Sequence, residues 1–145
     1  MRALDTNILV YAHRAETPEH RKAVEVLRNL ATGAERWVLP WPCIYEFLRV
    51  VTHPRVFHPP TPLAEALQAV RVLLDCPSLM LIAEGEHHQK VLADLLRTSA
   101  PTGNVVHDAH IAALAIEHGV SEVVTNDDSF RRFSGITVVN PFRSI

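Results

Sequence analysis

The sequence has little of what several common classes of protein require. Only two of its 145 residues are cysteine, and Cys43 and Cys76 are isolated, without a CxxC pair. Isolated cysteines suit a reducing compartment, argue against a zinc ribbon and are typical of small core residues. No apolar run approaches the roughly 20 residues that span a bilayer. Asp5 falls where a signal peptide would have its apolar stretch, so we expect a cytoplasmic protein.

Glycine and lysine are also scarce. The five glycines form no GxGxxG, GxxxxGK[ST] or GxSxG pattern, so dinucleotide, P-loop and α/β-hydrolase chemistry have no support. Lys22 and Lys90 are the only lysines, and the remaining cations are arginines, which match phosphate in a bidentate geometry. The formal net charge is −2, so no overall basic field indicates nucleic-acid binding.

What the sequence does contain is a regular alternation of short apolar segments and longer amphipathic ones. At 145 residues and 48% hydrophobic content, we expect a single domain over residues 1–145. The expected strands are 2–5, 37–39, 79–82, 122–125 and 136–139. The expected helices are 17–31, 43–52, 63–74, 86–98, 105–118 and a short one over 127–133, and residues 6–13 are expected to form a helix or a turn. This alternation predicts an α/β fold, with a short, mainly parallel central sheet in a three-layer α/β/α sandwich.

Local signals set the expected helix ends. Thr17 and Pro18 predict a cap followed by proline in the first turn of the helix over 17–31. Pro40 and Pro42 are expected to end the second strand, and the four prolines of 53–62 predict a loop. Gly119 lies where the residue after a helix C-terminus belongs.

One carboxylate interrupts the first apolar run, MRALDTNILV. Burying Asp5 without a partner would cost several kcal/mol or more. It can cap the following helix, since Asp is a preferred N-cap residue, or it can serve a ligand. Asp5 ends the first expected strand and Asp127 follows the strand over 122–125. Parallel sheets bind ligands beyond the carboxyl ends of their strands, so both acids fall on the ligand side.

Other acidic positions allow a similar choice between two interpretations. At 100° per residue, Asp108 falls within the apolar arc of its helix, although it can also be a first-turn charge favoured by the helix dipole. Glu46 lies at the edge of an apolar helix face, where the alternative is an ordinary solvated charge. Asp127 and Asp128, in the segment TNDD, can equally form a turn and a helix cap.

Convergence of these acids would demand a counter-charge. Two carboxylates about 5 Å apart repel by roughly 3 kcal/mol at an effective dielectric constant near 20. Such a cluster either holds protons or binds a hard cation, and carboxylate ligands select Mg²⁺ or Mn²⁺. His107 and His110 share a helix face and could bind zinc only with a further ligand, which the pattern does not supply; solvent-facing histidines are the alternative. The pair His87-His88 likewise does not indicate a metal site.

Four segments, in order along nearly the whole chain, resemble the PIN-domain ribonucleases, and in particular the VapC-type toxins of prokaryotic toxin–antitoxin pairs. They are LDTNILVYA, the Glu-containing CIYEFLRV, HDAHIAALA and VVTNDDSF. The resemblance implies one Mg²⁺ or Mn²⁺ site that also forms the catalytic centre, with supporting polar residues. Carried onto this sequence, the acids are Asp5, Glu46, Asp108 and Asp127, and the supporting residues are Asn7 and Thr125. The family pattern T-x-D favours Asp127, so Asp128 is the second choice.

The same resemblance implies metal-assisted hydrolysis of RNA that leaves a 5′-phosphate and a 3′-hydroxyl. It also implies a homodimer and an antitoxin protein whose segment plugs the site. Arg49, Arg131 and Arg132 are candidates for positioning the RNA. The neighbouring Phe130 and Phe133 are expected in the core rather than as base-stacking platforms.

Other functional classes remain open from the sequence. A phosphatase of the haloacid dehalogenase type also begins with an aspartate at a strand end. It needs a second aspartate two residues later, where this chain has Asn7, and a suitably placed lysine. A PIN nuclease of RNA processing, or a catalytically silent PIN-like binding module, would keep the same fold. Metal-dependent cleavage of RNA separates the nucleases from the phosphatase and from the silent module.

Overall fold

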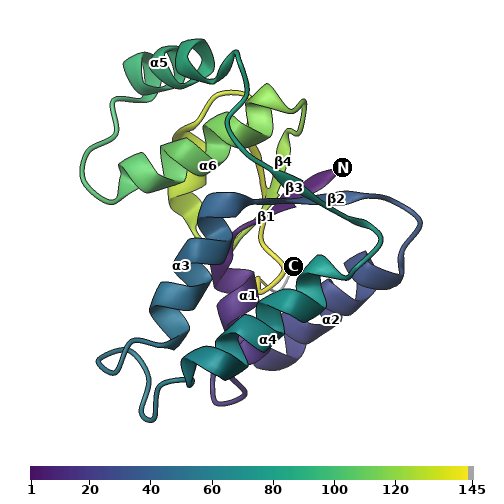
Figure 1. The fold of residues 1–145 in the computed structure, drawn as a ribbon. Helices are drawn as coiled ribbons and strands as arrows, with labels where there is room; N and C mark the ends of the chain where they lie inside the picture. Colours follow the sequence, from purple (N-terminus) through teal and green to yellow (C-terminus); the bar gives the residue numbers. More distant parts are fainter. Residues whose placement is uncertain (144–145) are drawn as a thin grey trace.

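The computed structural model describes residues 1–143 and contains one five-stranded sheet, in the order β3-β2-β1-β4-β5 (Figure 1). Every pairing between neighbouring strands is parallel. The strands are β1 (Arg2–Leu4), β2 (Trp37–Pro40), β3 (Leu79–Ile82), β4 (Glu122–Val124) and β5 (Thr137–Val139). The expected α/β fold with a short parallel sheet is therefore confirmed.

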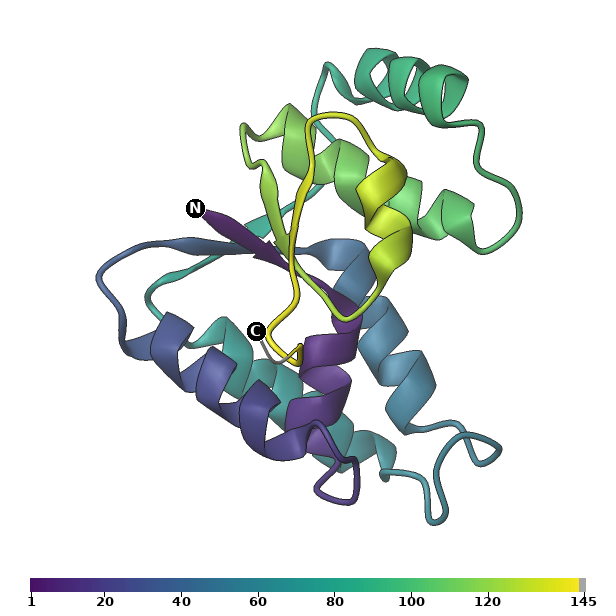
Figure 2. The same cartoon turned by 180° about the vertical axis from the view of Figure 1, so that it is seen from behind.

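Helices cover both faces of this sheet. They are α1 (Thr6–His13), α2 (His20–Thr32), α3 (Trp41–Val51), α4 (Leu63–Leu74), α5 (His88–Ser99), α6 (Val105–Glu117) and the 3₁₀ helix η1 (Asp128–Arg132). In Figure 1, α1, α2 and α4 lie below the sheet, and α6 lies above it with α5 outside α6. Helix α3 packs on α1 and α4, and η1 packs on α6, as Figure 2 shows from behind. No helix within residues 1–143 is long and apolar enough to cross a membrane.

The core is filled by aromatic and branched side chains between these layers. Trp37, Phe47, Phe130 and Phe133 are almost fully buried, which confirms the two last phenylalanines as core residues. Helix α6 is lined by buried alanines, and such small side chains let a helix approach its neighbours closely. Cys43 is buried and unpaired, as expected of a core cysteine.

Four helices, α2, α3, α5 and η1, begin at residues other than those expected, and local contacts explain the first two differences. The hydroxyl of Thr17 donates a hydrogen bond to the Arg14 carbonyl (2.8 Å), so Thr17 closes a turn and α2 starts only at His20. Helix α3 starts earlier than expected, at Trp41, and takes Pro42 into its first turn. Proline fits there because the first N–H groups of a helix have no partner within the helix.

The strand order determines where loops and side chains meet. From β1 the chain builds outward through β2 to β3, then crosses back to add β4 and β5 on the other side of β1. The two directions separate between β1 and β4, which is where sheets of this kind open a ligand crevice. The Asp5 amide donates to the Val124 carbonyl (3.1 Å), so the ends of these two strands are fixed together.

Candidate active site

Asp5 is buried at the end of β1, with its side chain fully engaged. One carboxylate oxygen accepts from the Thr6 amide (2.7 Å), and the other accepts from the Thr125 hydroxyl (2.7 Å) and the Asn7 amide (3.3 Å). The helix-cap interpretation is therefore correct for Asp5, yet it does not exclude the second one. Burial, reinforced by the charges of Asp108 and Glu46, raises the Asp5 pKa from 3.8 to about 6.

Thr125 connects the ends of β1 and β4. Its hydroxyl donates to Asp5 and accepts from the Asn7 side chain (3.1 Å) and from the Asp127 backbone amide (2.9 Å). Thr125 itself is completely buried. The two residues that the family resemblance nominates as supporting, Asn7 and Thr125, thus hold Asp5 and the backbone of Asp127 in one hydrogen-bonded group.

Asp108 and Asp127 are brought together by Ser129, a residue that the sequence did not single out. The Ser129 hydroxyl donates to Asp108 (2.6 Å), and its backbone amide donates to Asp127 (2.9 Å). Burial raises the Asp108 pKa, and the nearby charge of Asp127 adds to this effect. Asp127 is also the N-cap residue of η1, so Asp127, like Asp5, both caps a helix and lies beside the other acids.

Asp128 lies in a different environment from its neighbour. Its side chain is exposed and pairs with Arg131 (3.2 Å) and with Arg143. The hydrogen bond from Arg131 lowers the Asp128 pKa, the opposite direction to Asp108. Asp128 therefore already has its counter-charges, from Arg131 and Arg143.

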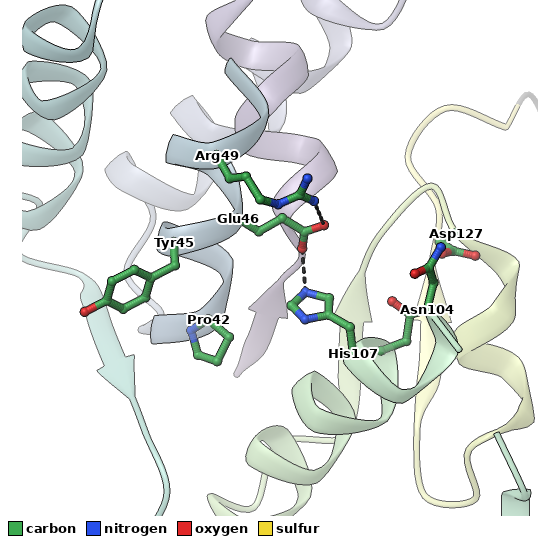
Figure 3. A pocket seen from close by; sticks show the side chains of 8 residues that line it. Pro42, Tyr45, Glu46, Arg49, Asn104, His107 and Asp127 are labelled. Atoms are coloured by element: carbon green, nitrogen blue, oxygen red, sulfur yellow. Dashed lines mark hydrogen bonds and ion pairs between the residues drawn. The ribbon is translucent and has the colours of Figure 1, made fainter. Parts of the chain in front are cut away.

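Glu46 reaches the group from α3 and is not a freely solvated helix charge. It accepts from the Thr6 hydroxyl (3.1 Å), and its other partners are the His107 imidazole and the Arg49 guanidinium, the latter at 3.5 Å. Figure 3 marks the contacts with His107 and Arg49. The hydrogen bond between His107 and Glu46 lowers the pKa of the carboxyl group and raises that of the imidazole. His107 is the imidazole at this site, and sequence reasoning missed it.

An open pocket of about 830 Å³ lies over these side chains (Figure 3). Glu46, Asp108 and Asp127 line it, and all three also line an adjoining depression of about 340 Å³ that contains Asp5. The remaining lining residues of the larger pocket are Pro42, Tyr45, Arg49, Asn104 and His107. All four acids predicted from the sequence thus border one continuous hollow at the carboxyl ends of β1 and β4.

The donor set of this hollow fits a hard divalent cation. Its ligand atoms are carboxylate oxygens, which Mg²⁺ and Mn²⁺ prefer. Burial raises the pKa values of Asp5 and Asp108, and the charges of neighbouring acids raise them further, so the ionised carboxylates lack full compensation from the protein. A bound cation would supply the missing compensation.

The predicted cationic residues divide into two groups. Arg49 lines the larger pocket beside Glu46. Arg131 and Arg132 are exposed on η1 and line neither hollow, and Arg131 is engaged by Asp128.

His107 and His110 do not act together, although their spacing suggested a shared face. His107 turns to Glu46, whereas the His110 imidazole pairs with Glu84 (2.6 Å), on the loop after β3. The two side chains leave α6 about 60° apart, which is enough for them to meet different neighbouring elements.

The fold is that of a PIN domain. The PIN domain family matches residues 2–136, and this chain belongs to that family. Ribonuclease VapC43 of Mycobacterium tuberculosis is 40% identical over 133 residues, which cover 92% of this chain and 90% of the relative. Ribonuclease VapC37 of the same species is 34% identical over 136 residues, 94% of each chain.

Solved structures agree on the fold. VapBC2 from Rickettsia felis, bound to a DNA fragment from its promoter, aligns with a TM-score of 0.69 over 96% of this chain and 97% of that chain, at 21% identity. The resemblance inferred from the four sequence segments is thus confirmed. Metal dependence is a property of the PIN-domain ribonucleases.

Proposed function

We propose that this protein is an Mg²⁺- or Mn²⁺-dependent endoribonuclease and the toxin of a type II toxin–antitoxin pair. The observation that carries the proposal is the meeting of Asp5, Glu46, Asp108 and Asp127 at one hollow. They come from four separate segments of a PIN domain, and the relatives of this chain are named VapC ribonucleases.

The four acids would hold the metal, and the residues around them would keep the site in shape. When bound, the ion acidifies a water molecule and neutralises charge that develops on the scissile phosphate. Thr125 and Asn7 orient Asp5, while Ser129 orients Asp108. The products would be a 5′-phosphate and a 3′-hydroxyl.

Arg49 offers the RNA a cation at the rim of the larger pocket. Its guanidinium lies 3.5 Å from Glu46 and its side chain is 64% exposed, so it can turn to a phosphate at little cost. Arg131 and Arg132, on the exposed surface of η1, would contact RNA only outside the pocket.

The open, acid-lined pocket also suits a protein inhibitor. An arginine inserted by an antitoxin could pair with the carboxylates or displace the metal. One structure of similar fold, with a TM-score of 0.64 over 99% of this chain, is a toxin–antitoxin complex from Klebsiella pneumoniae. We extend this assembly to the present chain, with a homodimer of the toxin and action on RNA in the cytoplasm.

The decisive test is cleavage of RNA by the purified protein after metal removal and re-addition of Mn²⁺ or Mg²⁺. Asp108→Asn should lower the rate by more than about 100-fold, because it removes a metal ligand and not merely an outer hydrogen bond. Asp128→Asn is the matched control, since it removes an equal charge one residue from Asp127, and it should cleave normally. Cleavage that needs no metal, or that survives Asp108→Asn, would refute the proposal; no cleavage by the wild type would favour the silent binding module.

The toxin role needs a separate experiment. Expression of the wild type in a suitable host should arrest growth, Asp5→Asn should not, and a co-expressed antitoxin should relieve the arrest. Equal growth of both strains, together with cleavage in vitro, would instead indicate a nuclease of RNA processing.

A further inference from the structure

A second group of potential metal ligands lies on the far side of α6 from the acid hollow. Glu84, His88 and His110 each place a ligand atom within 4.8 Å of the others. Glu84 lies on the loop after β3, His88 is the first residue of α5, and His110 is in the middle of α6. The His110 imidazole lies 2.6 Å from the Glu84 carboxylate, and the two imidazole rings are 5.6 Å apart between centroids.

A buried carboxylate stands behind this group. Glu117, whose side chain is only 5% exposed, contacts the Nδ1 atom of His88 at 3.2 Å. That contact fixes the ring and leaves Nε2 as the nitrogen available to another partner. A carboxylate behind a histidine is the usual arrangement around metal-bound imidazoles, because it sets the tautomer and raises the basicity of the ligand nitrogen.

The loop is shaped to pass close to this carboxylate. A Cβ atom at Gly85 would lie 2.4 Å from an oxygen of Glu117, so any other residue there would push the carboxylate away from His88. The neighbouring Glu84 is thereby carried to the imidazoles while its side chain stays half exposed. The cluster thus has one half-exposed member on a loop and two members on helices.

We propose that Glu84, His88 and His110 form a Zn²⁺ site, with Glu117 as the orienting carboxylate and water in the fourth position. Two imidazoles and one carboxylate suit zinc, whereas the acid hollow presents only oxygen ligands and suits Mg²⁺ or Mn²⁺. Zinc bonds of about 2.0–2.2 Å bring tetrahedral ligand atoms to about 3.4 Å from one another, so closure needs only a small side-chain movement.

The two sites are separate on α6. His110 and Glu117 are seven residues apart and leave the helix about 20° from each other, whereas Asp108 leaves it about 160° from His110. Helix α5 lies on the side of α6 that faces away from the sheet, and α5 packs mainly on α6 (Figure 1). Zinc would therefore fasten the loop after β3 and the start of α5 to the helix that carries Asp108.

The test uses the full chain, freed of metal with a chelator and then titrated with ZnCl₂ in saturating Mg²⁺, which keeps the acid hollow occupied. We expect one zinc ion per chain by calorimetry. The melting temperature should rise by about 5–10 °C at a zinc concentration about 100-fold above Kd. His88→Gln and Glu84→Gln should both lose the bound zinc and the rise in melting temperature.

Two controls separate this site from other sources of binding. His87→Gln alters the adjacent histidine, whose side chain is 75% exposed and outside the cluster, and it should bind zinc normally. Asp5→Asn should also keep the zinc. Glu84→Gln changes an exposed loop residue, so its loss of zinc cannot come from misfolding of the core. Unchanged zinc binding by His88→Gln and Glu84→Gln, no bound zinc in the wild type, or loss confined to Asp5→Asn would each overturn the proposal.

Discussion

Replacing Asp5 by asparagine should make the metal-free protein more stable at neutral pH, although it removes a predicted metal ligand. Burial raises the Asp5 pKa from 3.8 to about 6. At 1.36 kcal/mol per pH unit, ionised Asp5 costs the folded protein about 3 kcal/mol above pH 6. A neutral asparagine of the same shape avoids that cost.

Part of the gain is offset by lost hydrogen bonds. Asparagine can still accept from the Thr6 amide, but its NH₂ group would face the Thr125 hydroxyl and the Asn7 amide, both of which donate to Asp5 in the wild type. A lost hydrogen bond costs about 1 kcal/mol. The net gain should be about 1–2 kcal/mol, or about 3–8 °C in melting temperature for a chain of this size.

The pH dependence separates this cause from any other. Between about pH 4 and 6, folded Asp5 still holds a proton that the unfolded chain has lost, so wild-type stability falls as the pH rises through this window. Asparagine does not titrate. The advantage of Asp5→Asn should therefore grow from about pH 4 to 6 and stay constant above it.

Denaturant unfolding of chelator-treated protein, at about pH 4 and about pH 7.5, measures this difference. Asp128→Asn is the control, because Asp128 is exposed and paired with Arg131 and Arg143, and it should show no gain. Added Mn²⁺ should stabilise the wild type but not Asp5→Asn. A variant that is less stable than the wild type at pH 7.5 without metal, or one with equal gains at both pH values, would refute the reasoning.

Three further substitutions probe the rest of the site. Asp127→Asn should reduce cleavage at saturating Mn²⁺ far more than Asp128→Asn; the reverse order, in parallel rate assays, would exchange their assignments. His107→Gln should bind Mn²⁺ more tightly than the wild type near pH 6.5, because the hydrogen bond to Glu46 raises the imidazole pKa and the imidazolium competes with the metal for Glu46. Calorimetry at pH 6.5 and 8.5 should show this difference in Mn²⁺ affinity shrinking at the higher pH, where the wild-type imidazole has lost its proton. Thr125→Val should destabilise the protein by about 2–3 kcal/mol in denaturant unfolding, since its hydroxyl satisfies three polar groups, whereas Thr125→Ser should restore most of that loss.

The sequence predicted the architecture well because each element carries its own signals. Apolar runs of strand length and helical spacing are local, so the order of strands and helices could be read along the chain. The errors lie at helix starts, where tertiary contacts compete with local preference. Thr17 has the chemistry of a helix cap, but its hydroxyl is taken by the Arg14 carbonyl, and α2 begins three residues later.

The acids were predictable for a topological reason. Parallel strands end at the same edge of a sheet, so Asp5 and the residues after β4 had to meet. The role of Ser129 could not be read, because a serine after TNDD is typical of any turn. The pairing of His107 with Glu46 could not be predicted either, because the two residues are 61 positions apart and belong to helices whose packing the sequence does not specify.

The histidines show the same limit from the other direction. His107 lies three residues before His110, a spacing that suits one shared helix face. The residues that lie beside the His110 imidazole are instead Glu84 and His88, which precede it by more than twenty residues. The spacing of His110 and Glu117 was visible in the sequence, since residues seven apart share a face. The sequence does not show that α5 packs on α6, and it is this contact that places His88 beside His110 and Glu117.

The position of the acid hollow explains how the fold tolerates a buried charge at its centre. The paired strands β1 and β4 are almost fully buried at their carboxyl ends, with Leu4 1% and Val124 3% exposed, so the backbone there is rigid. A rigid strand end can present the first amide of α1 and the Thr125 hydroxyl to Asp5 without reorganisation, and these donors recover part of the cost of burial. The part that they do not recover is the raised Asp5 pKa, which comes chiefly from burial, with a smaller contribution from the like charges of Asp108 on α6 and Glu46 on α3. A divalent cation bound there would offset both the burial of these carboxylates and their mutual repulsion, so the cost of ionised Asp5 without metal and the proposed affinity for metal would have the same physical origin.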